Sequence, residues 1–214
     1  ASYGFSIPGI NQLLAADLSP PALKTAIPAF YPSGMHDGFV YVGGALSLAA
    51  LAQWAVIIAA DAAIRKGDNV ALAQVVPADQ LSGKWHPGSP LRDTPFFTKP
   101  DSLPFIADYL AHPSKGDYWQ EWDLPARLEG IEIPCLHVSG WYDTFITKTI
   151  EIYEALSAAG RAEHRLLVGP WFHIPWTQQV GCMDFGHAAR NIVDDYQIAW
   201  FDAQLKGDRS RLDA

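Results

Sequence analysis

Two short apolar runs near the C-terminus constrain the fold most, because an ionisable side chain follows closely after each. Residues 131–138 (IEIPCLHV) lead to Asp143, and residues 164–168 (HRLLV) lead to His173. Runs of this length, bounded by turn residues, are typical of buried strands. Ligands of open α/β sheets bind beyond the carboxyl ends of the strands, so the sequence predicts Asp143 and His173 at such an edge.

A serine on a sharp turn would complete this arrangement. An acid followed by a histidine is the second half of the order Ser…Asp…His found in α/β-hydrolases. Ser6 has Gly4 before it and Gly9 after it, and small residues suit a strained turn where strand and helix come close. Ser2 is a rival nucleophile, but the glycine that it would need before it has no position in this chain. The sequence therefore favours Ser6.

These three side chains suit acyl transfer. A serine hydroxyl is a weak nucleophile until a base removes its proton, and an imidazole can act as that base near neutral pH. Asp143 would fix the tautomer of His173 and stabilise the imidazolium. The long interval from Ser6 to Asp143 leaves room for an inserted cap, and the short interval to His173 fits one helix and one strand. The backbone N–H of Ile7 is the predicted oxyanion donor.

Each of these residues also has a purely structural interpretation. The string around Ser6 is common in loops, and Asp143 could cap a helix that begins near Phe145. His173 could be a loop histidine satisfied by backbone groups. Asp184 is the reserve acid if Asp143 fails. The order of the three residues at successive strand ends favours the triad.

The chain divides into three stretches. Residues 1–33 and 131–214 alternate strand and helix, as in a parallel sheet, whereas residues 34–130 carry helical patterns. The predicted fold is α/β: an α/β-hydrolase core, with an incomplete parallel sheet that starts at the nucleophile elbow and a helical cap inserted at 34–130. Besides the two apolar runs, the elements expected in the core are a strand over 24–30 and helices over 10–16, 145–159 and 187–205.

Four segments of the chain follow patterns known from one family. The first, G-x-S-Y-x-G-x-x-Q, is matched at Gly4, Ser6, Gly9 and Gln12, with Ile7 in place of the tyrosine. The other three are G-W-Y-D at 140–143, G-P-W-x-H at 169–173 and W-F-D-x-x-L-K-G at 200–207. Together they resemble X-prolyl dipeptidyl-peptidases, cocaine esterase, α-amino acid ester hydrolases and glutaryl acylases. The resemblance implies a serine hydrolase that cleaves an ester or amide, of acyl or X-prolyl peptide type, through an acyl-enzyme.

The resemblance also implies segments outside this chain. An α/β-hydrolase has several strands before its nucleophile strand, and family members continue after the L-K-G segment into a jelly-roll domain. We therefore expect the 214 residues to be part of a longer product. The resemblance implies that the second oxyanion donor is a tyrosine hydroxyl upstream of this chain. Loss of that donor would lower the rate roughly 10²–10³-fold. The alternative is a catalytically incompetent fragment that acts at most as a binding or interaction module.

Aromatic residues crowd the predicted site loops and would form an apolar acyl pocket. Those expected to bind substrate are Trp141, Tyr142, Trp171, Phe172 and Trp119. The carboxylates of segment 117–123 could hold a substrate amino group. Core packing is the alternative for the aromatic residues, and a solvated surface is the alternative for the carboxylates.

Charge and hydropathy limit the partners. A net charge of -8 without a basic stripe argues against nucleic acid. The apolar run 45–60 is shorter than the ~20 residues that span a bilayer and contains Gln53, so it reads as a buried cap helix that could also line an acyl pocket. The expected partner is a small-molecule ester or amide or a short peptide, with no membrane. Homo-oligomerisation and localisation stay open.

The histidines and cysteines predict neither a metal nor a cofactor. Cys135 and Cys182 are too few for a disulfide framework, and Cys135 reads as a small buried hydrophobe. His137 lies in an apolar run and is most simply a packed core histidine. The histidines that lack a companion at metal-ligand spacing are His36, His86, His112 and His164.

Overall fold

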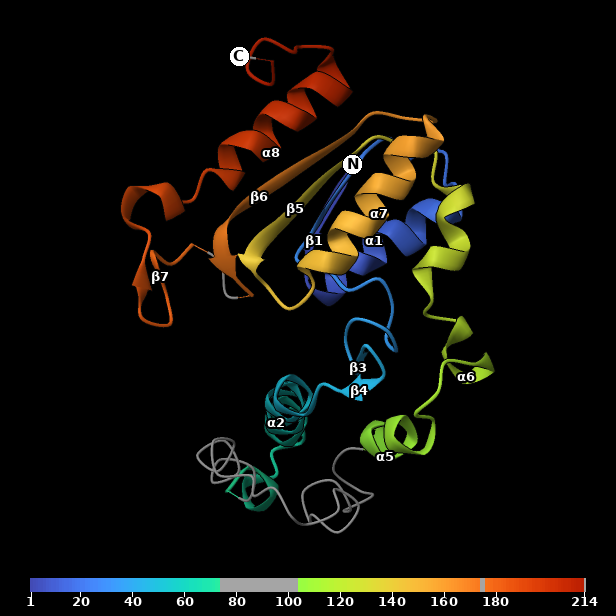
Figure 1. Ribbon diagram of the computed structural model, residues 1–214, viewed down its shortest axis with the longest axis vertical. Coiled ribbons are helices and arrows are strands. Elements are labelled where there is room, and N and C mark those ends of the chain that lie inside the picture. The colour runs from blue at the N-terminus through green and yellow to red at the C-terminus, as the bar shows by residue number, and fades with distance from the viewer. Residues whose placement is uncertain (74–103, 174–175, 214) are drawn as a thin grey trace. The chain divides into compact units, whose positions relative to one another are not determined.

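The computed structural model describes residues 1–73, 104–173 and 176–213, and His86 lies outside them. The chain forms two compact units (Figure 1). The first unit combines residues 1–38 with 119–214, and the second covers residues 39–118. The stretch predicted as a cap, 34–130, is thus longer than the second unit at both ends.

A four-stranded parallel sheet forms the centre of the first unit. Its strands are β1 (Ser2–Phe5), β2 (Ala26–Ala29), β5 (Cys135–Tyr142) and β6 (His164–Phe172), in the order β1-β2-β5-β6. The register joins Phe5 to Ala29, Ala29 to Val138 and Val138 to Leu167 in one row. The carboxyl ends of all four strands therefore meet at one edge. The predicted α/β class with a parallel sheet is confirmed.

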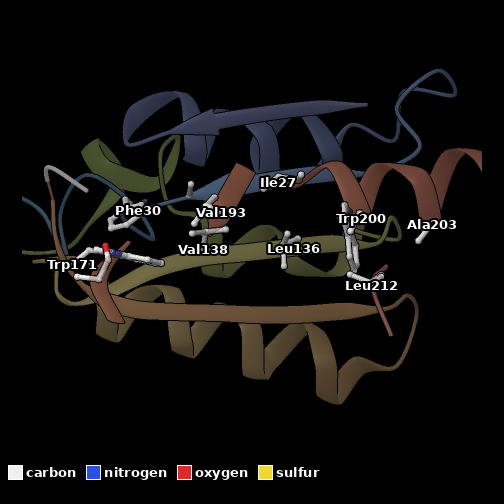
Figure 2. Close-up of a cluster of buried hydrophobic side chains, with 12 residues drawn as sticks. Ile27, Phe30, Leu136, Val138, Trp171, Val193, Trp200, Ala203 and Leu212 are labelled. Atoms are coloured by element: carbon white, nitrogen blue, oxygen red, sulfur yellow. Dashed lines mark hydrogen bonds between the residues drawn. The ribbon is translucent and has the colours of Figure 1, made fainter. Parts of the chain in front are cut away.

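Helices cover both faces of this sheet, as a parallel sheet requires. Side chains of α1 (Ile7–Asp17) and α7 (Ile146–Ala159) pack with Ala26 and Cys135 on one face. Side chains of α8 (Val193–Phe201) pack with Leu136 and Val138 on the other, together with the buried rings of Trp171 and Trp200 (Figure 2). Neighbouring residues of β5 thus serve opposite faces, as the two-residue repeat of a strand dictates.

The boundaries of β5 differ from the prediction. Residues 131–134 connect the 3-10 helix Leu124–Gly130 to the strand, and the N–H of Ile131 closes the last turn of that helix onto Leu128. Pro134 has no N–H to offer a strand partner. At the other end β5 continues to Tyr142, because Gly140 lets β6 approach closely: a Cβ there would overlap the carbonyl of Trp171.

The prediction of one helix over 187–205 is wrong. A short 3-10 helix, Gly186–Ala189, comes first, α8 begins at Val193, and a π-helical turn, Asp202–Lys206, follows. The side-chain oxygen of Asn191 accepts a hydrogen bond of 2.9 Å from the N–H of Val193, and α8 begins at that residue. This local hydrogen bond competes with a continuous helix. The helices predicted over 10–16 and 145–159 are confirmed as α1 and α7.

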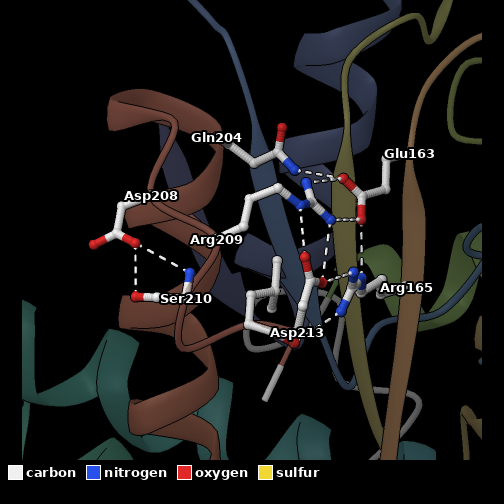
Figure 3. Close-up of polar contacts among 8 residues, drawn as sticks. Glu163, Arg165, Gln204, Asp208, Arg209, Ser210 and Asp213 are labelled. Atoms are coloured by element: carbon white, nitrogen blue, oxygen red, sulfur yellow. Dashed lines mark hydrogen bonds and ion pairs between the residues drawn. The ribbon is translucent and has the colours of Figure 1, made fainter.

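An ion-pair network fastens the segment after α8 to the start of β6 (Figure 3). The carboxylate of Glu163 accepts two hydrogen bonds from Arg209, both at 3.0 Å, and one each from Arg165 and Gln204 at 2.9 Å. Asp213 accepts from both arginines. These bonds, led by that from Arg209, lower the pKa of Glu163 to about 2.

The second unit contains a short hairpin and helices. Strands β3 (Tyr41–Val42) and β4 (Ala45–Leu46) pair only with each other, and α2 (Leu48–Lys66), α5 (Pro104–Ala111) and α6 (Asp117–Gln120) follow. Helix α6 ends in the first unit, which begins again at Trp119. Within the described part of 34–130, no strand joins the central sheet.

Helix α2 contains most of the apolar run 45–60. By length and composition it could cross a membrane, a test that a core helix also passes. Its buried residues recur at helical spacing on one face: Leu51, Ala52, Ala55, Val56, Ala59 and Ala63. Asp61 and Arg65 pair at 2.6 Å one turn apart. The left-handed Gly67 ends the helix.

Candidate active site

Ser6 occupies a strained turn between β1 and α1. Its φ of 61° and ψ of −125° are uncommon for a residue other than glycine. A Cβ on Gly4 would overlap the carbonyl of Pro8, and a Cβ on Gly9 would stand 2.7 Å from the carbonyl oxygen of Ala29. Both glycines are therefore needed where α1 leaves the sheet. The sharp strand-to-helix turn expected from the sequence is present.

A hydrogen-bonded chain joins the three residues singled out in the sequence. The Nε2 atom of His173 lies 3.0 Å from the Oγ atom of Ser6, and its Nδ1 atom lies 2.9 Å from the Oδ1 atom of Asp143. Asp143 directly follows β5 and His173 directly follows β6, so both come from the carboxyl edge of the sheet. The structure thus brings together the three residues that the sequence singles out.

Burial differs along this chain. The side chain of Asp143 is fully buried, whereas that of His173 keeps 32% of its surface exposed. The hydroxyl of Ser139, itself buried, points to the second carboxylate oxygen of Asp143 at 3.5 Å. Ser139 was missed in the sequence, where a serine four residues before the acid gives no signal of its own.

Aromatic rings enclose the imidazole of His173. The ring of Phe145 meets it edge-on with centroids 5.0 Å apart, and Phe5 lies tilted against it at 5.1 Å. Phe30 contributes a third ring at 6.4 Å. These contacts limit rotation of the imidazole. Phe145 was expected only as the start of a helix.

Ile7, the oxyanion donor predicted from the sequence, directly follows Ser6. It is the first residue of α1, and the first N–H groups of a helix have no acceptor within that helix. The carbonyl of Ser6 already accepts the N–H groups of Gly9 and Ile10, which fixes the first turn. The N–H of Ile7 therefore belongs to the positive end of α1 beside the Ser6 hydroxyl.

The five aromatic residues expected to bind substrate fall into different environments. Trp141 and Tyr142, at the end of β5, are 62% and 41% exposed, and Phe172 is half-buried. Trp171 is fully buried in the core cluster, and its Nε1 atom donates to the carbonyl of Ala189 at 2.8 Å. Trp119 is also buried and packs edge-on against His36. Core packing accounts for Trp171 and Trp119.

The reserve acid has a different partner. The Oδ1 atom of Asp184, on an exposed two-residue strand, accepts the N–H of Gly186 at 2.8 Å. It thereby stabilises a turn. Asp143 alone among these two carboxylates is hydrogen-bonded to His173.

A pocket of about 280 Å³ lies on the α8 side of β1. Phe5, which contacts His173, forms part of its wall, so the pocket borders the residues around the imidazole. Asp194 of α8 is the one carboxylate among the described residues that line it. The remaining lining residues are Tyr3, Gly4, Ala29, Trp176, Val193 and Gln197.

Sequence comparison relates the chain to known proteins. Residues 1–175 match the family described as X-Pro dipeptidyl-peptidase (S15 family). Over 223 aligned residues the chain is 29% identical to the cocaine esterase of Rhodococcus sp. (strain MB1 Bresler). The alignment covers 98% of this chain but 38% of that protein, so the chain spans less than half the length of this relative.

Structural comparison supports the fold. An α-amino acid ester hydrolase superposes with a TM-score of 0.62 at 19% identity, over 95% of this chain and 34% of that one. A CocE/NonD family hydrolase from Staphylococcus aureus superposes with a TM-score of 0.58 at 18% identity, over 99% of this chain and 30% of that one. At these identities the likeness bears on the fold alone, which is that of an α/β-hydrolase core.

Proposed function

Because the chain belongs to the X-Pro dipeptidyl-peptidase (S15) family, we propose that it is the triad-bearing part of a serine hydrolase that cleaves an ester or amide through an acyl-enzyme. One observation carries this proposal. The hydroxyl of Ser6, held in a strained turn, lies 3.0 Å from the Nε2 atom of His173. A nucleophile and a base within hydrogen-bond reach are the basic requirement of such chemistry.

In the proposed reaction Ser6 attacks the substrate carbonyl while His173 takes the hydroxyl proton on Nε2. That role requires Nδ1 to carry a proton, and the carboxylate of Asp143, 2.9 Å away, accepts a hydrogen bond from a protonated Nδ1. His173 then gives its Nε2 proton to the leaving group. Water then attacks the acyl-enzyme. His173 takes a proton from that water and returns it to the Oγ atom of Ser6 as the acid product leaves.

The oxyanion of the tetrahedral intermediate would accept a hydrogen bond from the backbone N–H of Ile7. A preorganised donor of this kind stabilises charge that develops only in the transition state, and one donor contributes about 3–4 kcal/mol. The positive end of α1 adds to the same effect, since Ile7 is its first residue.

Exposed aromatic surface beside Asp143 favours an apolar acyl or leaving group. Trp141 and Tyr142 precede the acid directly and present large rings to solvent. The names of the relatives refer to two kinds of substrate, esters and X-Pro peptides. A matched series of p-nitrophenyl esters and X-Pro p-nitroanilides would separate these two substrate types.

A fluorophosphonate probe tests the proposal, because it phosphonylates only activated serines. We expect labelling of the 214-residue chain, with the label on the peptide that contains Ser6. Ser6→Ala should abolish labelling, and the matched control Ser2→Ala, which removes the rival serine, should retain it. A folded wild-type chain that stays unlabelled would instead favour an incompetent fragment that only binds.

A further inference from the structure

A second cluster of reactive side chains lies at the amino ends of β5 and β6. Cys135 opens β5, His137 follows two residues later on the same face, and His164 opens β6 directly beside Cys135. The sulfur atom and one nitrogen atom of each ring all lie within 4.8 Å of one another. With a rise of about 3.3 Å per residue, Cys135 and His164 lie roughly 23–26 Å from the carboxyl ends of their strands, and His137 lies roughly 17 Å from the end of β5.

The spacing of the two imidazoles fits metal ligands. The Nε2 atom of His137 lies 3.3 Å from the Nδ1 atom of His164, which is long for a hydrogen bond. Two nitrogen atoms that each lie ~2.0 Å from one metal ion are roughly 3.3–3.5 Å apart at tetrahedral to trigonal angles. The sulfur atom of Cys135, which lies 3.5 Å from the carbonyl oxygen of Ile133, is within 4.8 Å of one nitrogen atom of each ring.

Neighbouring groups hold these ligands in place. The hydroxyl of Tyr31 is 2.7 Å from the Nδ1 atom of His137, which leaves the Nε2 atom directed at the cluster. A partner on the far nitrogen is the usual second-shell support of a metal-bound histidine. The Nε2 atom of His164 is buried and has no hydrogen-bond partner among the described residues. The hydrogen-bonding capacity of this cluster is therefore not fully used.

We propose that Cys135, His137 and His164 form a three-coordinate site for Cu(I). Thiolate sulfur and imidazole nitrogen together suit copper, and three ligands suffice for this ion, whereas zinc usually takes four. The cluster contains no carboxylate. A monovalent ion and one thiolate leave no net charge in a buried place, where an uncompensated charge is costly.

Binding is a ligand exchange at Cu(I). It forms one copper–nitrogen bond to each imidazole ring and one copper–sulfur bond to Cys135. The S–H bond of Cys135 breaks as the copper–sulfur bond forms, and the thiol proton leaves to solvent. No change of oxidation state is involved.

Anaerobic competition with the chelator bicinchoninate tests the site, because its Cu(I) complex is coloured. The wild-type chain should withdraw one Cu(I) per molecule, with an X-ray absorption edge typical of three-coordinate Cu(I). Cys135→Ser should weaken binding by roughly 100-fold or more, beyond what loss of second-shell support costs. Cys182→Ser is the matched control, since it removes the exposed thiol and should leave binding unchanged.

His164→Gln guards against misfolding, because His164 is only half-buried and its replacement should leave the circular dichroism spectrum unchanged. This variant should also lose Cu(I). The proposal is overturned if the wild type takes no copper from the chelator, if Cys135→Ser or folded His164→Gln retains it, or if Zn²⁺ displaces Cu(I) at equal concentration. The first outcome would leave a neutral, hydrogen-bonded core cluster.

Discussion

Asp143 and His173 form a hydrogen bond of 2.9 Å between a fully buried carboxylate and an imidazole that keeps 32% of its surface exposed. The turn after β5 fixes Asp143, because the backbone N–H of Asp143 donates a hydrogen bond to the carbonyl of Gly140. The exposed partner lies 3.0 Å from the Oγ atom of Ser6 and stays accessible to solvent. Rigid orientation on one side and access on the other are what a general base needs.

Replacing Asp143 should show whether Asp143 or Asp184 is the acid that acts on His173. We expect Asp143→Asn to lower kcat for p-nitrophenyl acetate by about 10⁴-fold, because an amide favours the wrong tautomer of His173. Asp184→Asn is the control and should leave kcat unchanged, since Asp184 bonds to Gly186 instead. Steady-state kinetics measures both. Equal losses in the two variants would contradict the assignment of Asp143.

The glycine before the nucleophile should prove structural. Gly4→Ala places a methyl group against the carbonyl of Pro8 and should lower the free energy of unfolding by about 1–3 kcal/mol. Gly116→Ala is a matched control, because nothing lies within 4 Å of its added Cβ. Urea denaturation followed by tryptophan fluorescence compares the two. A Gly4→Ala chain as stable as the control would refute the close approach of α1 to β1.

Two tryptophans in neighbouring motifs should behave in opposite ways. Trp141→Ala, at an exposed position, should raise KM for aromatic esters with little change in stability. Trp171→Ala empties a buried site and should cost about 3–5 kcal/mol of the free energy of unfolding. Thermal melts and KM values on both variants check this. If Trp141→Ala lost stability and Trp171→Ala kept it, the result would contradict the exposed position of Trp141 and the buried position of Trp171.

The network around Glu163 should make stability depend on pH. The pKa of Glu163 is lowered to about 2 from an ordinary value of 4.5, so its contribution is complete above about pH 4.5 and is lost as pH falls through about 2. At neutral pH we expect Glu163→Gln to cost roughly 1 kcal/mol, as partly exposed ion pairs do.

Glu129→Gln, at an exposed position outside that network, serves as its control and should match the wild type at every pH. The difference between Glu163→Gln and wild type, followed by urea denaturation, should shrink from pH 5 towards pH 2. A difference that stays constant over this range would mean that the carboxylate charge is not what stabilises the segment after α8.

The sequence predicted those parts of the fold whose signal is local. Ser6, Asp143 and His173 each sit in a short motif beside a strand, and strand order alone brings them to one edge. Ser139 and Phe145 could not be recognised, because their contacts with Asp143 and His173 exist only after folding. Trp171 was expected at a substrate pocket, but its motif serves the core.

The same limit applies to the second cluster. His164 showed no companion at metal-ligand spacing, since Cys135 and His137 lie on the neighbouring strand rather than one helical turn away. The break before α8 was also hidden, because the side chain of Asn191 decided it rather than hydrophobic periodicity. In both cases a contact across space or a single side-chain bond outweighed the pattern.

The most direct measurement of the central claim is mass spectrometry of the acyl-enzyme. The chain would be mixed with p-nitrophenyl acetate, quenched in acid within seconds, digested and searched for acetylated peptides. Our account predicts one acetyl group on the hydroxyl of Ser6, formed in the wild type and absent in His173→Ala. An acetyl group on any other residue of a folded chain, or acetylation of Ser6 that persists in His173→Ala, would contradict it.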